Sequence, residues 1–192
     1  MQLKARYIDG DLTNRESIHR IANEAGDVDI LVNNAAFFPM GPTVDQDSES
    51  FDRAVESNVR APYFLTAAIA PLMIARGKGS IVNVSTMAAK LGMSGLSVYA
   101  ATKAALESFT RTWAAEFASS GVRVNTVSPG PTATEKVIAR WGDSLNDLAS
   151  TTLLLRTAAT SEIAEVILFL ASDRSSYVTG ATFAADGGRT AI

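Results

Sequence analysis

Short apolar segments alternate with helical segments along almost the whole chain, and this alternation constrains the fold more than any other feature. Apolar runs lie in 28–36, 77–86 and 122–131, and none alternates polar and apolar residues as a strand with one solvated face would. Apolar strands separated by helices of ten or more residues are typical of a parallel sheet covered by helices on both faces. The sequence therefore predicts an α/β fold with right-handed crossovers.

The expected elements run in one order from end to end. They are strand 5–12, helix 13–26, strand 28–36, a helix near 48–59, helix 61–76, strand 77–86, helix 98–119, strand 122–131, helix 161–172 and a final strand and turn within 180–188. A chain of 192 residues is long enough for one hydrophobic core and short for two. We therefore expect one domain, residues 1–192.

Composition removes several classes of function. The net charge is −3 and the basic residues are scattered, so we expect no nucleic-acid partner. The absence of cysteine excludes disulfides and thiolate chemistry, and with His19 as the single histidine we expect no metal site. The most apolar stretch, 61–75, is shorter than a membrane span, so we expect no membrane partner and a helix in a protein interface instead. The N-terminus lacks the apolar region of a signal peptide, and we expect a cytoplasmic protein.

Tyr99 and Lys103 stand four residues apart at the start of helix 98–119. Chance gives about 0.1 such pairs in a chain with this composition, so the spacing alone is weak evidence. The ordinary interpretation is a tyrosine at the edge of the buried face and a lysine whose stem covers that edge. A catalytic interpretation is possible because Thr86 lies at the carboxyl end of strand 77–86, thirteen residues before Tyr99. A strand end and a helix start can direct two hydroxyl groups to one point.

Ligands of doubly wound sheets lie at the carboxyl ends of the strands. In this sequence that rule selects residues 33–36, 85–86 and 128–130. Among them, Ser85 is expected to point away from Thr86, because side chains alternate along a strand.

A set of motifs in this order resembles the short-chain dehydrogenase/reductase family. They are "NNAA" (33–36), "NVRAPYFLT" (58–66), "GSIVNVST" (79–86), Tyr99 with Lys103, "RVNTVSPGPTATE" (123–135) and "GATFAADGG" (180–188). The resemblance implies a Rossmann-like doubly wound parallel sheet that binds NAD or NADP. It also implies an oxidoreductase that interconverts a secondary alcohol and a ketone by hydride transfer.

The same resemblance assigns catalytic roles to four residues. Tyr99 is the expected general acid/base, and the positive charge of Lys103 lowers its pKa and also holds the nicotinamide ribose. Thr86 stands where the family usually has serine, and its hydroxyl can still polarise the substrate oxygen. Asn58 matches the asparagine of the family's water-linked proton relay to the lysine. Its ordinary interpretation is an amide that satisfies nearby backbone groups.

The resemblance also assigns cofactor contacts. Besides Tyr99 and Lys103, these are Asp11 at the adenine, Asn33, Asn34 and Ala35 beside the adenosine ribose, and Pro129, Gly130 and Thr134 on the nicotinamide side. Each group has an alternative, since Asp11 can form a turn and a Pro-Gly pair is common in loops.

The family's first strand, glycine-rich turn, helix and second strand have no counterpart before residue 5. We therefore expect an N-terminally truncated domain that holds strands 3 to 7 of the family's sheet. Helix N-termini with glycine-rich turns bind pyrophosphate, and the region that separates NAD from NADP is also missing. A cofactor-deficient, non-catalytic scaffold or binding protein of the same fold is therefore the alternative function. A sugar-nucleotide epimerase or dehydratase also shares the Tyr-Lys spacing, but the short tail ending in "ADGG" argues against it.

Segment 132–160 takes the position of the family's substrate lid, and the expected substrate is a small-molecule alcohol or ketone. Helices 61–76 and 98–119 match helices that pair between family subunits. We therefore expect a homotetramer or a homodimer.

Overall fold

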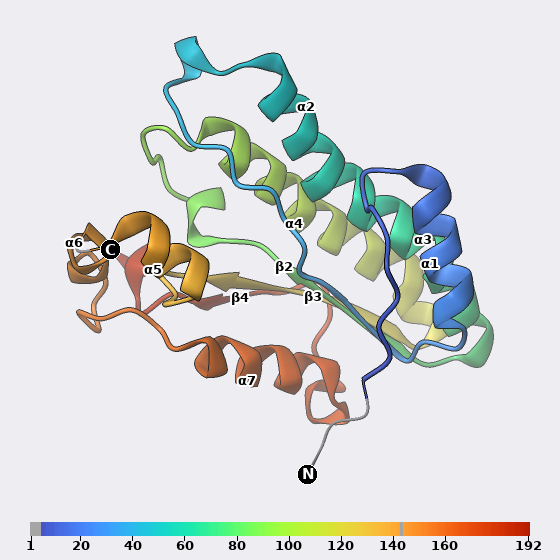
Figure 1. Ribbon diagram of the computed structural model, residues 1–192. Coiled ribbons are helices and arrows are strands. Elements are labelled where there is room, and N and C mark those ends of the chain that lie inside the picture. Colours follow the sequence, from blue (N-terminus) through green and yellow to red (C-terminus); the bar gives the residue numbers. More distant parts are fainter. Residues whose placement is uncertain (1–4, 143) are drawn as a thin grey trace.

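The computed structural model describes residues 5–142 and 144–192, and a parallel sheet forms its centre (Figure 1). Four strands of the described chain pair in sequence order: β1 (Ile30–Asn33), β2 (Gly79–Val84), β3 (Val122–Pro129) and β4 (Thr182–Ala185). All three pairings are parallel. The predicted α/β class is confirmed.

Helices cover both faces of the sheet. They are α1 (Arg15–Ala25), α2 (Ser48–Val55), α3 (Ala61–Arg76), α4 (Ser97–Phe117), α5 (Glu135–Trp141), α6 (Ser144–Ser150) and α7 (Thr160–Ala171). In Figure 1, α1, α3 and α4 lie on one side of the sheet and α7 on the other. The strands point towards α5 and α6, which therefore stand beside the carboxyl edge.

Local sequence signals define the helix ends. Helix α1 begins after Asn14, whose side chain accepts a hydrogen bond from the Ser17 N–H at 3.0 Å, and α2 begins after Asp47, which accepts from the Ser50 N–H at 2.7 Å. Such caps satisfy N–H groups that have no partner inside the helix. Helix α3 ends at Gly77 in the left-handed conformation, where glycine meets no steric penalty.

Two apolar clusters hold the layers together. On the α3 and α4 side, the buried members include Met73, Ile81, Trp113, Val122 and Val124. On the α7 side they are Val82, Val127, Ile163 and Leu170. Successive strand residues point to opposite faces, so β2 and β3 supply apolar side chains to both clusters.

A buried polar ladder crosses the sheet beneath α3 and α4. The Asn33 side chain donates to Thr66 Oγ1 at 3.3 Å and to Asn83 Oδ1 at 2.9 Å, and the Asn83 amide donates to Thr110 Oγ1 at 2.8 Å. Thr110 in turn shares a 2.6 Å hydrogen bond with Thr126. Asn33, Asn83 and Thr126 stand opposite one another in the strand pairings. A slip of one residue would break this ladder, which therefore fixes the register.

The expected strand 5–12 is wrong. Residues 5–11 are described but form no strand, and the Arg20 side chain holds this segment by donating to the Asp9 carbonyl at 2.6 Å. In the described residues only β2 pairs with β1, and no strand pairs with the other edge of β1. A strand needs a partner for its N–H and C=O groups, and in the family's strand order the third strand pairs with the second. Without that partner, this segment stays irregular.

The open side of β1 also carries apolar side chains. Ile30 and Val32 are 48% and 38% exposed, whereas the alternate residues Leu31 and Asn33 are buried.

Within the part of the chain that the structure describes, no helix is long and apolar enough to span a membrane.

Replacing Gly121 with alanine should destabilise the fold more than the same change at Gly77. Both residues follow helical turns with nearly identical backbone angles, φ 73° and ψ 13° against φ 69° and ψ 18°. A Cβ at Gly77 meets open space, whereas one at Gly121 collides with the Gly77 carbonyl oxygen. We expect a loss of about 1 kcal/mol at Gly77 from the left-handed backbone and about 1–3 kcal/mol more at Gly121 from the clash.

Urea unfolding of the two variants measures this difference. Equal losses at the two positions would contradict the close approach of the two turns.

Candidate active site

The ammonium group of Lys103 is buried at the carboxyl edge of the sheet. Lys103 is 2% exposed, and its Nζ donates a hydrogen bond to the Val84 carbonyl at the end of β2 at 2.7 Å. Burial lowers the pKa of Lys103 to about 8. One of three N–H donors is thereby used within the described residues, which leaves donors for a ligand at this edge.

Tyr99 lies one helical turn before Lys103 on α4. Its ring meets Phe38 edge-on with the centroids 4.6 Å apart, and Lys103 Nζ lies 6.0 Å from the centroid of the tyrosine ring. Burial raises the pKa of the Tyr99 phenol to about 12, and the neighbouring Thr86 hydroxyl acts in the opposite direction. The structure thus brings Tyr99, Lys103 and Thr86 together, as predicted.

Thr86 follows β2 and starts a short turn over Met87–Ala89. Its Oγ1 accepts a hydrogen bond from the Ala88 N–H at 3.3 Å, which helps to fix the side chain. Ser85 points into the protein instead, where it is 3% exposed. The expectation that Ser85 turns away from the site is confirmed.

Asn58 lies in a π-helical turn, Glu56–Arg60, between α2 and α3. Its Oδ1 accepts from the Phe37 N–H at 2.8 Å, and its Nδ2 donates to the Phe37 carbonyl at 2.8 Å and to Thr102 Oγ1 at 3.0 Å. The amide thus satisfies backbone groups, as its ordinary interpretation expects, but of a residue 21 positions away and not of its own helix. The water-linked relay to Lys103 stays a prediction. Asn58 links the loop after β1 to the turn of α4 that carries the tyrosine and the lysine.

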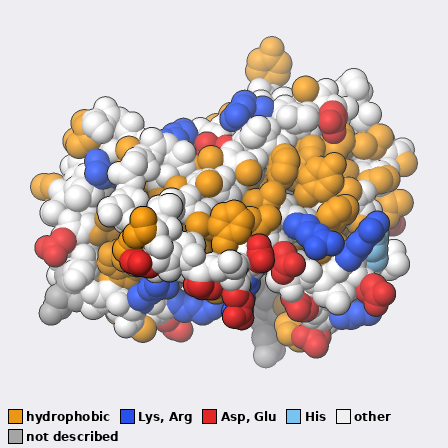
Figure 2. Space-filling view, turned by 90° about the horizontal axis from the view of Figure 1, so that it is seen from above, with side chains coloured by type: hydrophobic (Ala, Val, Ile, Leu, Met, Phe, Trp, Pro, Cys, Tyr) orange, Lys and Arg blue, Asp and Glu red, His pale blue; other side chains and the backbone are white. Residues whose placement is uncertain are grey.

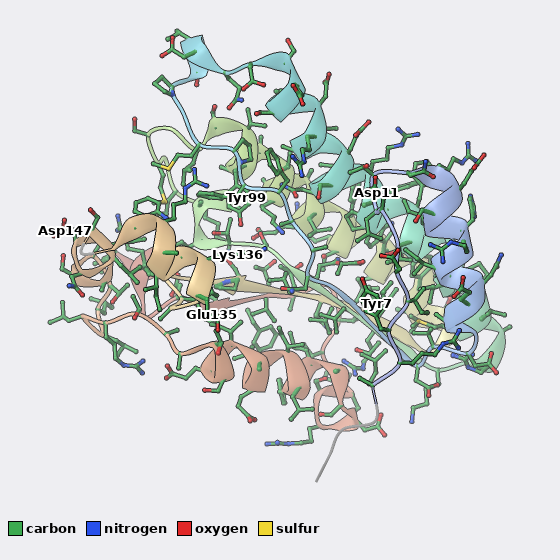
Figure 3. The ribbon with its side chains drawn as sticks, viewed as in Figure 1. Tyr7, Asp11, Tyr99, Glu135, Lys136 and Asp147 are labelled. Atoms are coloured by element: carbon green, nitrogen blue, oxygen red, sulfur yellow. The ribbon has the colours of Figure 1, made fainter. Side chains whose placement is uncertain are left out.

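Two of the predicted cofactor residues have side chains engaged in hydrogen bonds within the protein. Asp11 accepts hydrogen bonds from the Thr13 N–H and hydroxyl, both at 2.8 Å, and these bonds lower the pKa of its carboxyl group. Asn33 is 8% exposed, and its side chain belongs to the polar ladder. In Figure 3, Asp11 lies towards α1 and Tyr99 towards α5, so the predicted adenine and nicotinamide ends are far apart along the edge.

Asn34 and Ala35 line a small cavity beside the end of β1. The cavity has a volume of about 50 Å³, and Leu12 and Ser57 also line it. This is where the resemblance places the adenosine ribose. A larger pocket of about 460 Å³ lies between α7, β4 and residues 153–158, and none of the four predicted catalytic residues lines it.

Pro129, Gly130 and Thr134 shape the start of the lid segment. Gly130 donates its N–H to the Ala185 carbonyl at 3.0 Å, and a Cβ at this position would lie 2.6 Å from the Asp186 Cα, so only glycine fits. Thr134 caps α5 by accepting from the Val137 N–H at 3.2 Å. Helices α5 and α6 fall within the predicted lid, 132–160.

Sequence reasoning missed several residues of this edge. Phe38 covers Tyr99, and the Arg140 guanidinium of α5 lies 5.1 Å from the centre of the Phe38 ring. Glu107 of α4 is 7% exposed and accepts a hydrogen bond from Ser85. The signal for Glu107 was available, because it follows Tyr99 and Lys103 at four-residue spacing on one helix face.

Known proteins resemble this chain in sequence and in fold. The family described as Enoyl-(Acyl carrier protein) reductase matches residues 1–190. Cyclopentanol dehydrogenase of Comamonas sp. (strain NCIMB 9872) is 37% identical over 194 residues, which cover 98% of this chain and 78% of that protein.

Solved structures extend the likeness. A short chain dehydrogenase/reductase family protein superposes with a TM-score of 0.94 at 54% identity, covering 97% of this chain and 77% of the other. A gluconate 5-dehydrogenase from Burkholderia cenocepacia J2315, solved with NADP and tartrate, superposes with a TM-score of 0.90 at 29% identity, covering 95% and 74%.

Replacing Lys103 with methionine should remove part of the pH dependence of stability. Because burial lowers the Lys103 pKa from 10.5 to about 8, the unfolded chain binds more protons than the folded chain between these values. The stability that Lys103 gains from losing its proton is therefore fully present above its pKa in the unfolded chain, and it is lost as the pH falls through its pKa in the folded chain. Over this interval the wild-type free energy of unfolding should rise by up to about 1.4 kcal/mol per pH unit.

Urea unfolding from about pH 7.5 to about pH 9 measures the slope, because Tyr99 is still almost fully protonated in the unfolded chain over this interval. Lys78→Met is the control, because Lys78 is exposed and pairs with Asp173 at the surface. An unchanged slope in Lys103→Met would refute the buried ammonium.

Proposed function

Because this chain belongs to the short-chain dehydrogenase/reductase family, we propose that it is an NAD(P)-dependent oxidoreductase that interconverts a secondary alcohol and a ketone. Tyr99 is the general acid/base in this proposal. The observation that supports it best is the buried pair of Tyr99 and Lys103 beside Thr86 at the carboxyl edge. The coarser conclusion, an oxidoreductase of this family, follows from the relatives.

The proton chemistry follows from the positions of three groups. During reduction, the Tyr99 phenol gives its proton to the carbonyl oxygen, and during oxidation the phenolate takes the proton of the alcohol. The Thr86 hydroxyl donates a hydrogen bond to the same oxygen and orients it. The nicotinamide, when bound, supplies or accepts the hydride at the carbon.

Lys103 makes this proton transfer possible near neutral pH. Burial, only partly offset by the Thr86 hydroxyl, raises the pKa of Tyr99 to about 12, which is too high for a base at neutrality. A cation near the ring favours the phenolate, and its effect is strong because few water molecules screen a buried charge. Asn58 holds the supporting turn through Thr102.

The residues of this edge fit a dinucleotide in part. Lys103 has unused donors for a ribose, and Asn34 and Ala35 border the small cavity at the expected adenosine ribose. Asp11 is assigned to the adenine, and Asn33, Pro129, Gly130 and Thr134 complete the predicted contacts. The 192 residues contain no glycine-rich turn for the pyrophosphate. Family members use NAD or NADP, and relatives of known structure bind NADP.

The substrate in this proposal is a small alcohol or ketone. Relatives named for the oxidation of cyclic alcohols, such as cyclopentanol dehydrogenase and cis-4-hydroxycyclohexanecarboxylate dehydrogenase, support this class.

The lack of cysteine fits the reducing cytoplasm, where we place the protein.

An apolar helix face supports assembly into a homotetramer or homodimer. Tyr63 and Leu72 of α3 are 44% and 47% exposed, and Tyr63 packs against Phe109 and Trp113 of α4. Figure 2 shows hydrophobic side chains gathered over a broad part of one face of the molecule. Contiguous exposed apolar patches are typical of protein interfaces, which supports assembly in this proposal.

The non-catalytic scaffold is the second candidate. It remains the alternative to the enzyme, and a test of dinucleotide binding separates the two.

Tyr99→Phe should reduce turnover at least about 1,000-fold, because it removes the proton donor and leaves the ring in place. NAD(P)H oxidation with a panel of cyclic ketones measures turnover, and NAD(P)H fluorescence measures binding. Tyr63→Phe, on the exposed face of α3, is the control and should retain activity. Undiminished turnover in Tyr99→Phe would overturn the mechanism. No dinucleotide binding by the wild type, with assembly intact, would favour the scaffold.

Phe38→Ala should widen the range of substrates. Phe38 packs edge-on against Tyr99, so removal of its ring opens space beside the phenol. We expect kcat/KM for bulky ketones to rise relative to small ones by about tenfold, which corresponds to about 1.4 kcal/mol. Phe169→Ala, which removes a ring that packs on Phe183 in the α7 layer, is the control and should leave this ratio unchanged. An unchanged ratio in Phe38→Ala would show that Phe38 does not limit access.

A further inference from the structure

Glu107 is a buried carboxyl group to which the proton chemistry above gives no role. It lies on α4 one turn after Lys103 and is 7% exposed. Removing a carboxylate from water is costly unless it is paired or hydrogen-bonded. A buried glutamate beside a candidate active site therefore needs an explanation.

Its described partner is the side chain of Ser85. The Ser85 hydroxyl donates to Glu107 Oε1 at 2.9 Å and also lies 3.3 Å from the Lys103 carbonyl oxygen. A serine has one proton to donate, so the shorter contact to the carboxylate is the main hydrogen bond. Through this bond α4 holds the residue that follows β2.

Ser85 is also fixed from its other side. Its N–H donates to the Val127 carbonyl of β3 at 2.8 Å, which continues the sheet pairing one residue beyond β2. The next residue is Thr86, whose side chain points the opposite way, towards Tyr99. A rotation of the Ser85 backbone would therefore move the Thr86 hydroxyl directly.

We propose that Glu107 is a positioning residue, which holds the Thr86 hydroxyl at Tyr99 by anchoring Ser85 to α4. This inference rests on the proposed function and adds a residue that contacts neither substrate nor cofactor. Lys103 donates a hydrogen bond to the Val84 carbonyl, and Glu107 accepts one from the Ser85 hydroxyl. Two successive turns of α4 therefore hold the two successive residues Val84 and Ser85. The strand end and the helix then act as one rigid unit.

Thr110 provides a matched control on the same helix. It is buried, and like Glu107 it ties α4 to β2, by accepting from the Asn83 amide. Its contact lies within the polar ladder, deeper in the sheet than Ser85. If Glu107 has a merely structural role, substitutions at Glu107 and Thr110 should have the same effect on kcat.

The experiment compares Glu107→Leu, Glu107→Gln, Ser85→Ala, the Ser85→Ala/Glu107→Leu double variant and Thr110→Val. We expect Glu107→Leu and Ser85→Ala each to lower kcat about tenfold with KM nearly unchanged, because a displaced Thr86 affects the reacting oxygen more than binding. Glu107→Gln keeps an oxygen acceptor and should restore kcat to within about twofold. The double variant should lose no more than either single one, because both break the same contact.

Thr110→Val should lower the unfolding temperature and leave kcat unchanged. If Glu107→Leu does not fold, the kcat values of Ser85→Ala and Glu107→Gln still test the proposal. Equal losses of kcat in Thr110→Val and Glu107→Leu, or a normal kcat in both Glu107→Leu and Ser85→Ala, would overturn the proposal.

A second measurement is independent of turnover. In a sample with labelled threonine methyl groups, the Thr86 resonance should shift in Glu107→Leu and in Ser85→Ala, and keep its position in Thr110→Val and in Glu107→Gln. A wild type without turnover would count against the proposed function, while the NMR result would still test the anchoring. A Thr86 resonance that does not move in Ser85→Ala would overturn the anchoring itself.

Discussion

The hydrogen bond from the buried Lys103 ammonium to the Val84 carbonyl is the contact on which the site depends. A charged amine can be buried here only where an oxygen meets it, so α4 must cross the sheet with this turn over the end of β2. That placement puts Tyr99 beside Thr86 and Glu107 beside Ser85. The apolar packing of Trp113 against the sheet brings α4 close, and the lysine selects its position along the strand.

Much of the fold could be predicted because the pattern of β2, β3 and α4 is local. Apolar strands and amphipathic helices carry their periodicity in their own residues. Residues 5–11 show the limit of such reasoning, since their composition suits a strand but strand formation depends on a neighbour. The meeting of Tyr99, Lys103 and Thr86 was predicted mainly by the resemblance to the family, because their spacing alone is weak evidence.

Side-chain partners across the fold were much harder to predict. Asn33 and Asn58 have the same side chain, yet one completes an internal ladder and the other binds a backbone segment 21 residues away. Nothing in an amide reveals which partner it finds. Glu107 escaped notice for a related reason, because a glutamate on a helix usually marks a solvated face. Burial and pairing of such groups are properties of the tertiary structure.

The π-helical turn at Glu56–Arg60 makes the position of Asn58 sensitive to the length of the helix. Such a turn holds one residue more than the α-helical turn it replaces, and it can arise from a single-codon insertion in a helix. Here it places Asn58 where its amide reaches both Phe37 and Thr102. Loss of one codon between α2 and α3 would turn every preceding side chain by about 100° relative to those that follow. The number of residues in this helical segment therefore constrains the site together with the identity of the asparagine.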